Sequence, residues 1–359
     1  MSRATARPAP PLAPGTKPAP GYEILAHLAR TGWLDLYDAW SEERDCRCVM
    51  KVLRPDCRHG QRLSDRLLLE GRWLRTFTHP HLVRAYETFE SPEPLVVLET
   101  LTGETLSHLV GRLSRRPAAG DVALLGVQLC SAIHYLHGHG LLHLDLKPSN
   151  VVVDCGHAKV LDLSVARAPG IAPPGVGTFG YLAPEQARGG PLSTAADVWG
   201  IGVTLYEVAT GEAPFDGGEN MDETVDETDD GTGGRADRYP QLEEPAPPIR
   251  SRRRLPRDLA AAIDSCLRTD PAARPTVLEL ADALDAALPW QRRHVAPSPD
   301  ARRAGRKTAG RRPEGRVAGR GEALRVRQGT RRRAARPLTG RRVNVLPRDR
   351  LLNLHRAGG

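Results

Sequence analysis

The stretch His143-Leu144-Asp145-Leu146-Lys147-Pro148-Ser149-Asn150 decides the fold of this chain. Apolar residues precede it at Leu141-Leu142, and the run Val151-Val152-Val153 follows it. Because a β-branched run is typical of a buried strand, the polar residues form a short loop between two buried elements. The loop brings an acid, a base and an amide together.

Four side chains in and after this loop suit phosphoryl transfer. Asp145 can accept a proton, Lys147 can bind a phosphate, and Asn150 can offer a carbonyl oxygen to a hard cation. Asp162 follows Asn150 by twelve residues, after a second strand-like run, and is a second hard oxygen ligand. A hydroxyl that attacks a metal-bound phosphoryl group needs such a set, because this chemistry is mostly positioning and charge neutralisation.

The loop resembles the catalytic loop of protein kinases, His-Arg-Asp-Leu-x-x-x-Asn, and Asp162 resembles the aspartate of their Asp-Phe-Gly motif. A chance polar loop between hairpin strands is the alternative, which eight residues and a correctly spaced aspartate disfavour. The resemblance implies that Asp145 and Lys147 are catalytic, Asp145 as proton acceptor and Lys147 on the γ-phosphate. It also implies that Asn150 and Asp162 bind ATP through Mg²⁺ or Mn²⁺.

The chain falls into three parts by composition. Residues 1–20 hold six prolines and almost no large apolar groups, which predicts disorder. Residues 291–359 carry 20 Arg and 1 Lys against two Asp and two Glu, a net charge of +17, and are predicted to be a disordered basic tail. Residues 21–290 therefore form the expected domain, with a small lobe at 21–101 and a large lobe at 102–290.

The cysteines and apolar runs indicate the compartment. The six cysteines show no paired Cys-x-x-Cys spacing of a zinc site, and the N-terminus lacks the apolar core of a signal peptide. The sequence contains no run of about 18 apolar residues, so no transmembrane segment is expected. We expect a cytoplasmic protein.

In the small lobe, alternating patterns at 22–25, 34–37 and 48–53 predict antiparallel strands. Protein kinases carry Gly-x-Gly-x-x-Gly in the first turn, but here these glycines become Ala29, Thr31 and Leu34, and only the additional Gly32 is present. Side chains at 29 and 31 hinder close approach of backbone amides to phosphate. The turn either covers the nucleotide loosely or is simply a hairpin turn.

Val49-Met50-Lys51 resembles the Val-Ala-Ile-Lys strand, which implies that Lys51 contacts the α- and β-phosphates. Residues 62–76 read as a helix with leucines on one face. Glu70 lies on the same broad face and needs a cation, for which Lys51 is the natural candidate. An exposed Glu70 that pairs with Arg66 is the alternative.

The adenine pocket is expected after the strands at 85–90 and 95–99. The resemblance implies that Leu98 guards the back of this pocket. It also implies that Glu99 and Leu101, in the hinge Glu99-Thr100-Leu101, bind adenine through their backbone. Glu104 is expected to reach the ribose.

The large lobe begins with a helical pattern at 121–139, which is expected to be a core helix without chemistry. His143 is expected to be structural. Leu144 replaces the arginine that in the family binds a phosphate on the activation loop, and no Ser, Thr or Tyr lies between Ser164 and Thr178. We therefore expect a loop that needs no phosphorylation.

Residues 177–186, Gly-Thr-Phe-Gly-Tyr-Leu-Ala-Pro-Glu-Gln, resemble the end of the activation segment in bacterial Ser/Thr kinases. The resemblance implies that Glu185 is buried against Arg274. Residues 197–202 resemble the helix that anchors the catalytic loop. Thr178 and Lys147 favour Ser or Thr over Tyr as the acceptor.

These features predict an α+β, two-lobed protein-kinase-like fold and an ATP-dependent protein serine/threonine kinase of the bacterial type. A weak or inactive pseudokinase that binds nucleotide or acts as a scaffold is the alternative. It is favoured by the missing glycines of the first turn and by Ser164, which replaces the flexible glycine of the Asp-Phe-Gly motif. Expected partners are protein substrates with Ser or Thr acceptors. The basic tail could bind nucleic acid or an anionic surface. The eight acids from Asp216 to Asp230 predict a solvated insertion at 216–234.

Overall fold

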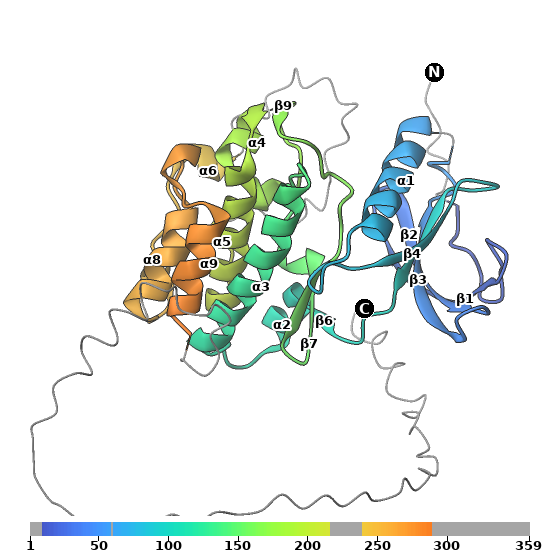
Figure 1. Cartoon of the computed structure of the whole chain (residues 1–359), viewed down its shortest axis with the longest axis horizontal. Helices are drawn as coiled ribbons and strands as arrows, with labels where there is room; N and C mark the ends of the chain where they lie inside the picture. The colour runs from blue at the N-terminus through green and yellow to red at the C-terminus, as the bar shows by residue number, and fades with distance from the viewer. Residues whose placement is uncertain (1–8, 59, 216–238, 289–359) are drawn as a thin grey trace, which may run out of the picture. The chain divides into compact units, whose positions relative to one another are not determined.

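The computed structural model describes residues 9–58, 60–215 and 239–288. The predictions for the acidic insertion 216–234 and the basic tail 291–359 lie outside the described residues. The described part combines a mostly antiparallel sheet region with a mostly helical region (Figure 1).

A five-stranded antiparallel sheet forms the small lobe, in the order β1-β2-β3-β5-β4. Its strands are β1 Tyr22–Arg30, β2 Leu34–Ser41, β3 Cys46–Leu53, β4 Ala85–Phe89 and β5 Leu95–Glu99. Alternation divides the two faces: Leu95 and Val97 pack into an outer cluster, whereas Val96 and Leu98 pack into the main core. Lys51 is directly opposite Val96 in the β3–β5 ladder. The same alternation therefore turns Lys51 toward the inner face.

The N-terminal segment, residues 9–20, covers the outer face of this sheet. Gly15 donates its N–H to the Ile24 carbonyl at 2.8 Å, and Leu12 donates its N–H to the Tyr37 hydroxyl at 2.9 Å. Ala19 is buried in the outer cluster. The predicted disorder of residues 1–20 is wrong for residues 9–20, because the sheet supplies the apolar surface that the segment itself lacks. Residues 1–8 lie outside the described part of the chain.

Helix α1, Gln61–Thr76, lies against the inner face of the sheet (Figure 1). Leu67 and Leu74 are fully buried on its apolar side, as the predicted periodicity requires. A Cβ on Gly71 would lie 2.4 Å from Thr88 Cγ2 and 2.6 Å from Val96 Cγ2. Glycine at this position lets the helix approach the sheet closely, which brings Glu70 over β3.

The large lobe is built on two long helices, α3 Ala119–Gly138 and α5 Thr194–Thr210, with α8 Arg257–Cys266 and α9 Val277–Ala286 packed beside them. The shorter helices are α2 Leu106–Arg112, α4 Pro184–Arg188, α6 Pro240–Glu243 and α7 Ile249–Arg252. Strands β6 Glu104–Thr105, β7 Val151–Asp154 and β8 His157–Val160 form one small sheet, and β9 Gly170–Ala172 pairs with β10 Gly190–Leu192. The loop at residues 143–150 lies between α3 and β7.

Helix α3 is long and apolar enough to cross a membrane by length and composition. However, Val122, Leu129, Ile133 and Leu136 are fully buried in the core that α3 shares with α5 and α9. The core helix of a globular domain passes the same length test. The structure therefore agrees with the predicted core helix.

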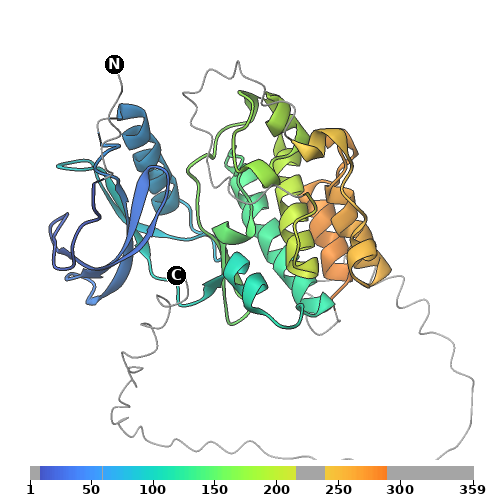
Figure 2. The same ribbon diagram turned by 180° about the vertical axis from the view of Figure 1, so that it is seen from behind.

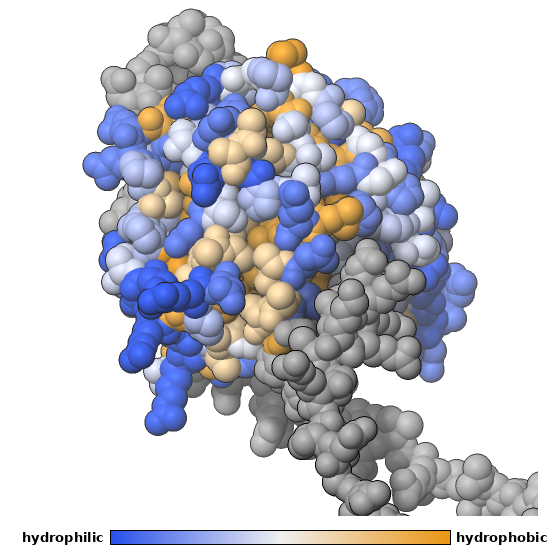
Figure 3. All heavy atoms as spheres, turned by 60° about the vertical axis from the view of Figure 1, so that its left-hand side comes forward, coloured by the Kyte–Doolittle hydropathy of each residue, from blue (hydrophilic) through white to orange (hydrophobic). Residues whose placement is uncertain are grey.

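Large exposed hydrophobic side chains are scattered over the described surface. Leu25, Leu28, Leu69, Ile171 and Leu278 belong to four different elements. On the face that Figure 3 draws, hydrophobic residues form small groups between hydrophilic ones. Single exposed apolar side chains are ordinary on a protein surface.

The architecture confirms the predicted α+β fold, with a small antiparallel lobe that carries one main helix and a larger, mostly helical lobe (Figure 2). Helices α8 and α9 are the last two helices of the described part of the large lobe.

Candidate active site

Lys51, Glu70 and Asp162 come from β3, α1 and the segment after β8, and they meet in one group in which Lys51 and Glu70 are buried and Asp162 is partly exposed. Lys51 Nζ lies 2.7 Å from Glu70 Oε1 and 3.4 Å from Asp162 Oδ2. Glu70 also accepts the N–H of Leu163 at 3.3 Å. The alternative partner Arg66 instead donates to the Ser164 carbonyl. The predicted Lys51–Glu70 pair is therefore present, and it is tied to the residues after Asp162.

The charges in this group shift one another. Burial alone would lower the pKa of Lys51, but the carboxylates of Asp162 and Glu70 outweigh it and raise that pKa above its ordinary value. Burial raises the pKa of Glu70 to about 7, against the opposing attraction of Lys51. Although burial opposes ionisation of Asp162 too, Lys51 and the Ser164 N–H hold its pKa well below the usual range. Asp162 is thus ionised at neutral pH and able to bind a cation.

The catalytic loop is anchored by Asp197 in the first turn of α5. The N–H groups of His143 and Leu144 donate to its two carboxylate oxygens at 2.9 and 2.7 Å. Leu144 has a left-handed φ of 65°, which this double anchor holds in place. Burial lowers the pKa of His143, and its Nδ1 accepts the N–H of Asp145 at 3.2 Å. His143 is fully buried, and its structural role stays a prediction.

Asp145 stands at the centre of a second polar group. The Thr178 hydroxyl donates to its Oδ1 at 2.6 Å, and Asn150 Nδ2 donates to its Oδ2 at 2.8 Å. Lys147 Nζ lies 3.4 Å from Asp145 Oδ2 and donates to the Thr178 hydroxyl. The two predicted catalytic residues are therefore in contact, together with a threonine for which no contact was predicted.

The backbone brings Asn150 close to the residue before Asp162, because Leu161 donates its N–H to the main-chain carbonyl of Asn150 at 3.0 Å. The side-chain nitrogen of Asn150, Nδ2, donates to Asp145, so the side-chain oxygen, Oδ1, is the atom suited to a cation. Within the described ranges, no group of three or more His, Cys, Asp or Glu side chains could hold a metal. Mg²⁺ commonly takes one or two protein oxygens and completes its shell with water and substrate phosphates, so these two residues fit it.

The hinge prediction concerns Glu99 and Leu101. Glu99 donates its N–H to the Arg84 carbonyl at 3.0 Å, while its carboxylate accepts from Arg84 N and pairs with Lys159. Leu101 is half-buried against the main core. The carboxylate of Glu104, expected at the ribose, is bonded to His108 and Arg112 of α2. Adenine contacts by Glu99 and Leu101 remain a prediction.

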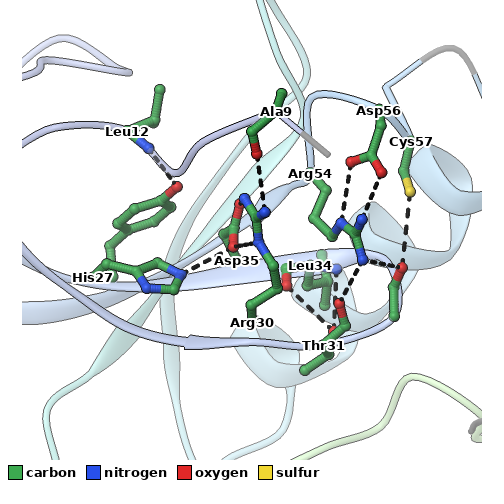
Figure 4. A network of polar contacts seen from close by, with 12 residues as sticks. Ala9, Leu12, His27, Arg30, Thr31, Leu34, Asp35, Arg54, Asp56 and Cys57 are labelled. Carbon is green, nitrogen blue, oxygen red and sulfur yellow. Dashed lines mark hydrogen bonds and ion pairs between the residues drawn. The ribbon is translucent and has the colours of Figure 1, made fainter. Parts of the chain in front are cut away.

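The turn between β1 and β2 is held by charged side chains, as Figure 4 shows. Arg30 makes a two-pronged ion pair with Asp35 across the hairpin, with N–O distances of 2.7 and 2.8 Å. Arg54 donates to the carbonyls of Thr31 at 3.2 Å and Gly32 at 3.0 Å. The glycine-poor turn is therefore fixed by side chains that reach its backbone, which the sequence interpretation did not foresee.

The end of the activation segment is fixed to the large lobe. Glu185 receives two hydrogen bonds from the Arg274 guanidinium, at 2.6 and 2.8 Å, as predicted, although its side chain is 13% exposed rather than fully buried. Gln186 is buried and bonded to two loops, and Gln241 of α6 donates to the Leu182 carbonyl at 3.2 Å. The sequence interpretation gave these glutamines no role. For Gln186 the available signal was its place directly after Glu185 in the 177–186 motif, whereas nothing in the sequence singled out Gln241.

Comparisons with known proteins agree with this geometry. The family model for the protein kinase domain matches residues 32–284. The serine/threonine-protein kinase PknB of Mycolicibacterium smegmatis is 32% identical over 272 residues, which cover 70% of this chain and 40% of that protein. The DNA damage-responsive serine/threonine-protein kinase RqkA of Deinococcus radiodurans is 34% identical over 218 residues, 58% of this chain and 32% of that protein. The chain thus spans about two fifths or less of these relatives.

The solved structure of a double mutant of the Mycobacterium tuberculosis PknI kinase domain has a similar fold. Its TM-score is 0.60 at 21% sequence identity, and the match covers 77% of this chain and 99% of that structure.

Proposed function

Because this chain belongs to the protein kinase family, we propose that it transfers the γ-phosphate of ATP to serine and threonine hydroxyls of proteins. The observation that carries this proposal is the convergence of two polar groups from distant parts of the chain. Lys51, Glu70 and Asp162 form the first. Asp145 and Lys147 form the second around one hydroxyl.

The first group suits the nucleotide. Lys51 is held in place by its ion pair with Glu70 and supplies positive charge for the α- and β-phosphates of ATP. Asn150 and Asp162 offer two oxygens to Mg²⁺ or Mn²⁺, which when bound neutralises phosphate charge. Residues that pre-position a charged ligand lower the entropic cost of reaction.

The second group suits a Ser or Thr acceptor. The Thr178 hydroxyl donates to Asp145 at 2.6 Å, which supports the same carboxylate as the acceptor of a substrate hydroxyl proton. Lys147 contacts both, so it supplies positive charge where the γ-phosphate meets that hydroxyl.

A nucleotide-binding or scaffolding pseudokinase is the second candidate. It is favoured by the turn at residues 29–34, whose carbonyls are bonded to Arg54 and whose side chains replace the usual glycines. Such a protein would bind ATP but leave the phosphate on it.

The test compares the full chain with an Asp145→Asn variant. With Mg²⁺ and ATP, wild-type protein should phosphorylate a basic protein on Ser or Thr, and Asp145→Asn should lower kcat by at least about 100-fold. Asp282→Asn, on the exposed face of α9, is the matched control and should keep full activity. ATP binding without transfer by the wild type, or equal activity in Asp145→Asn, would favour the pseudokinase.

We also propose a cytoplasmic location, which the free thiols of all six cysteines support. Binding of nucleic acid or an anionic surface by residues 291–359 stays a prediction from charge. It would weaken steeply with salt and survive Asp145→Asn.

A further inference from the structure

We propose that the buried side-chain amide of Gln186 locks the activation segment onto the catalytic loop without any phosphate. The inference rests on the proposed function and names how that site is kept in position. The activation segment here means residues 162–185. The Gln186 bridge means the hydrogen bonds from this side chain to Leu144 and Val176.

Every polar atom of the Gln186 side chain has a hydrogen-bond partner. Gln186 is the third residue of α4 and is 2% exposed. Its Nε2 donates to the Leu144 carbonyl and to the Val176 carbonyl, both at 2.8 Å. Its Oε1 accepts the N–H of Ala183 at 3.0 Å. A fully satisfied buried amide holds one orientation, because any other leaves buried polar groups without partners.

The two carbonyls lie within two residues of Asp145 and of Thr178 in the sequence. Leu144 precedes Asp145, and Val176 precedes Thr178 by two residues. The bridge therefore joins the backbone beside the proton acceptor to the backbone that presents the Thr178 hydroxyl. Loss of the bridge should loosen the 2.6 Å contact between Thr178 and Asp145.

Gly177 shows how closely the two segments approach. A Cβ at this position would lie 2.7 Å from the Leu144 carbonyl oxygen and 2.8 Å from Leu182 Cδ2. Its φ of 121° also lies where side chains are rarely tolerated. The activation segment thus passes the catalytic loop with no room for a side chain, at the point where the bridge crosses.

A phosphate-dependent link would need a basic residue before Asp145 and a hydroxyl that can be phosphorylated in the facing segment, and this chain has neither there. Leu144 is buried and uncharged, and residues 165–177 contain no Ser, Thr or Tyr. Backbone bonds hold the segment on either side: Leu142 and Arg167 exchange two, and Gly175 donates to the Gln186 carbonyl at 2.8 Å. A neutral amide that donates to carbonyls needs neither a kinase upstream nor a counter-charge.

The experiment replaces Gln186 by Met in the full chain, which keeps the volume and removes the hydrogen bonds. We expect kcat for phosphorylation of a basic protein to fall about tenfold or more, because two buried carbonyls lose their donor. The KM for ATP should stay within about twofold, since Lys51, Glu70 and Asp162 are untouched. Hydrogen exchange of residues 175–182 should accelerate.

Gln128→Met is the matched control. Gln128 is also a buried amide, with Nε2 on the Gly156 carbonyl at 2.8 Å and Oε1 on the Ala158 N–H, but it ties the far end of the β7–β8 hairpin. The Gln128→Met variant should keep the wild-type kcat and the wild-type rate of hydrogen exchange at residues 175–182. Equal losses in both variants would reduce Gln186 to an ordinary core residue and overturn the proposal.

Gln186→Glu covers the case in which the Met variant does not fold. An ionised carboxylate at this position would face two carbonyl oxygens, whereas a protonated carboxyl group regains one donor. Activity relative to wild type should therefore rise as the pH falls from about 8 to about 6, since burial raises a carboxyl pKa. A flat ratio contradicts the bridge.

Phosphatase treatment completes the test. Wild-type protein should keep its activity, and loss of activity mapped to a phosphate on residues 162–185 would overturn the proposal. If the wild type transfers no phosphate, the proposed function fails instead. The exchange comparison of Gln186→Met with Gln128→Met then decides the bridge by itself.

Discussion

At the scale of single residues, the site depends on buried charges that would be costly alone. Lys51 and Glu70 are 5% and 0% exposed, yet each has a partner of opposite charge. Removing one member of a buried pair usually costs more than the pair contributes, because the remaining charge is left without compensation. In this protein Lys51 would keep Asp162 as a second partner at 3.4 Å.

Glu70→Gln is the residue-scale prediction. Without its charged partner, Lys51 should move toward Asp162, where it competes with the metal. We expect kcat/KM for ATP to fall about 10- to 100-fold, with a lower temperature of unfolding. Steady-state kinetics over a range of Mg²⁺ concentrations measures this. Glu43→Gln, an exposed position on the β2–β3 turn, should behave as wild type. Unchanged kinetics in Glu70→Gln would show that the ion pair has no part in nucleotide binding.

At the scale of elements, the β1–β2 hairpin has few glycines in its turn and is stabilised by the ion pair between Arg30 and Asp35. Burial alone would raise the pKa of Asp35, but hydrogen bonds from Arg30 and His27 outweigh it and hold that pKa below its ordinary value. Arg30 also donates to the Ala9 carbonyl, so the same side chain joins the hairpin to the N-terminal segment (Figure 4).

The pH dependence of the Arg30–Asp35 ion pair follows from the lowered pKa of Asp35. A carboxylate with a depressed pKa in the folded state contributes stability that is present above its unfolded pKa of 3.8 and is lost as the pH falls through the folded value. Asp35→Asn should therefore melt below wild type at neutral pH, and the difference should shrink below about pH 4. Thermal unfolding between about pH 3 and 7 measures it, with exposed Asp282→Asn as control. A constant difference would contradict an ionic role.

At the scale of the whole molecule, the sequence predicted two contacts in which one buried charge needs a partner of opposite charge. Lys51–Glu70 and Glu185–Arg274 are of this kind, because a buried charge restricts its possible partners strongly. The Gln186 bridge was missed because its partners are backbone carbonyls, which every residue has. The Arg30–Asp35 pair was missed because the β1–β2 register brings these two residues opposite each other, and the predicted first strand at 22–25 ended before Arg30.

The N-terminal segment was misjudged for a different reason. Composition describes what a segment can bury by itself, and residues 9–20 bury little. Their order comes from the outer face of the sheet, where Tyr22, Tyr37 and Met50 form a cluster that needs a cover. Non-local packing of this kind overrides a local compositional signal.

This difference leads to a prediction about truncation. Removing residues 1–20 should uncover the outer cluster and break the bonds from Leu12 to Tyr37 and from Arg30 to Ala9, whereas removing only residues 1–8 leaves all of these in place. We expect the longer deletion to lower the unfolding temperature by roughly 5–10 °C and the shorter one to change it little. Thermal unfolding of the two proteins beside the full chain measures this. Equal unfolding temperatures would mean that residues 9–20 only rest on the sheet, and the domain boundary predicted near residue 21 would then be the right one for stability.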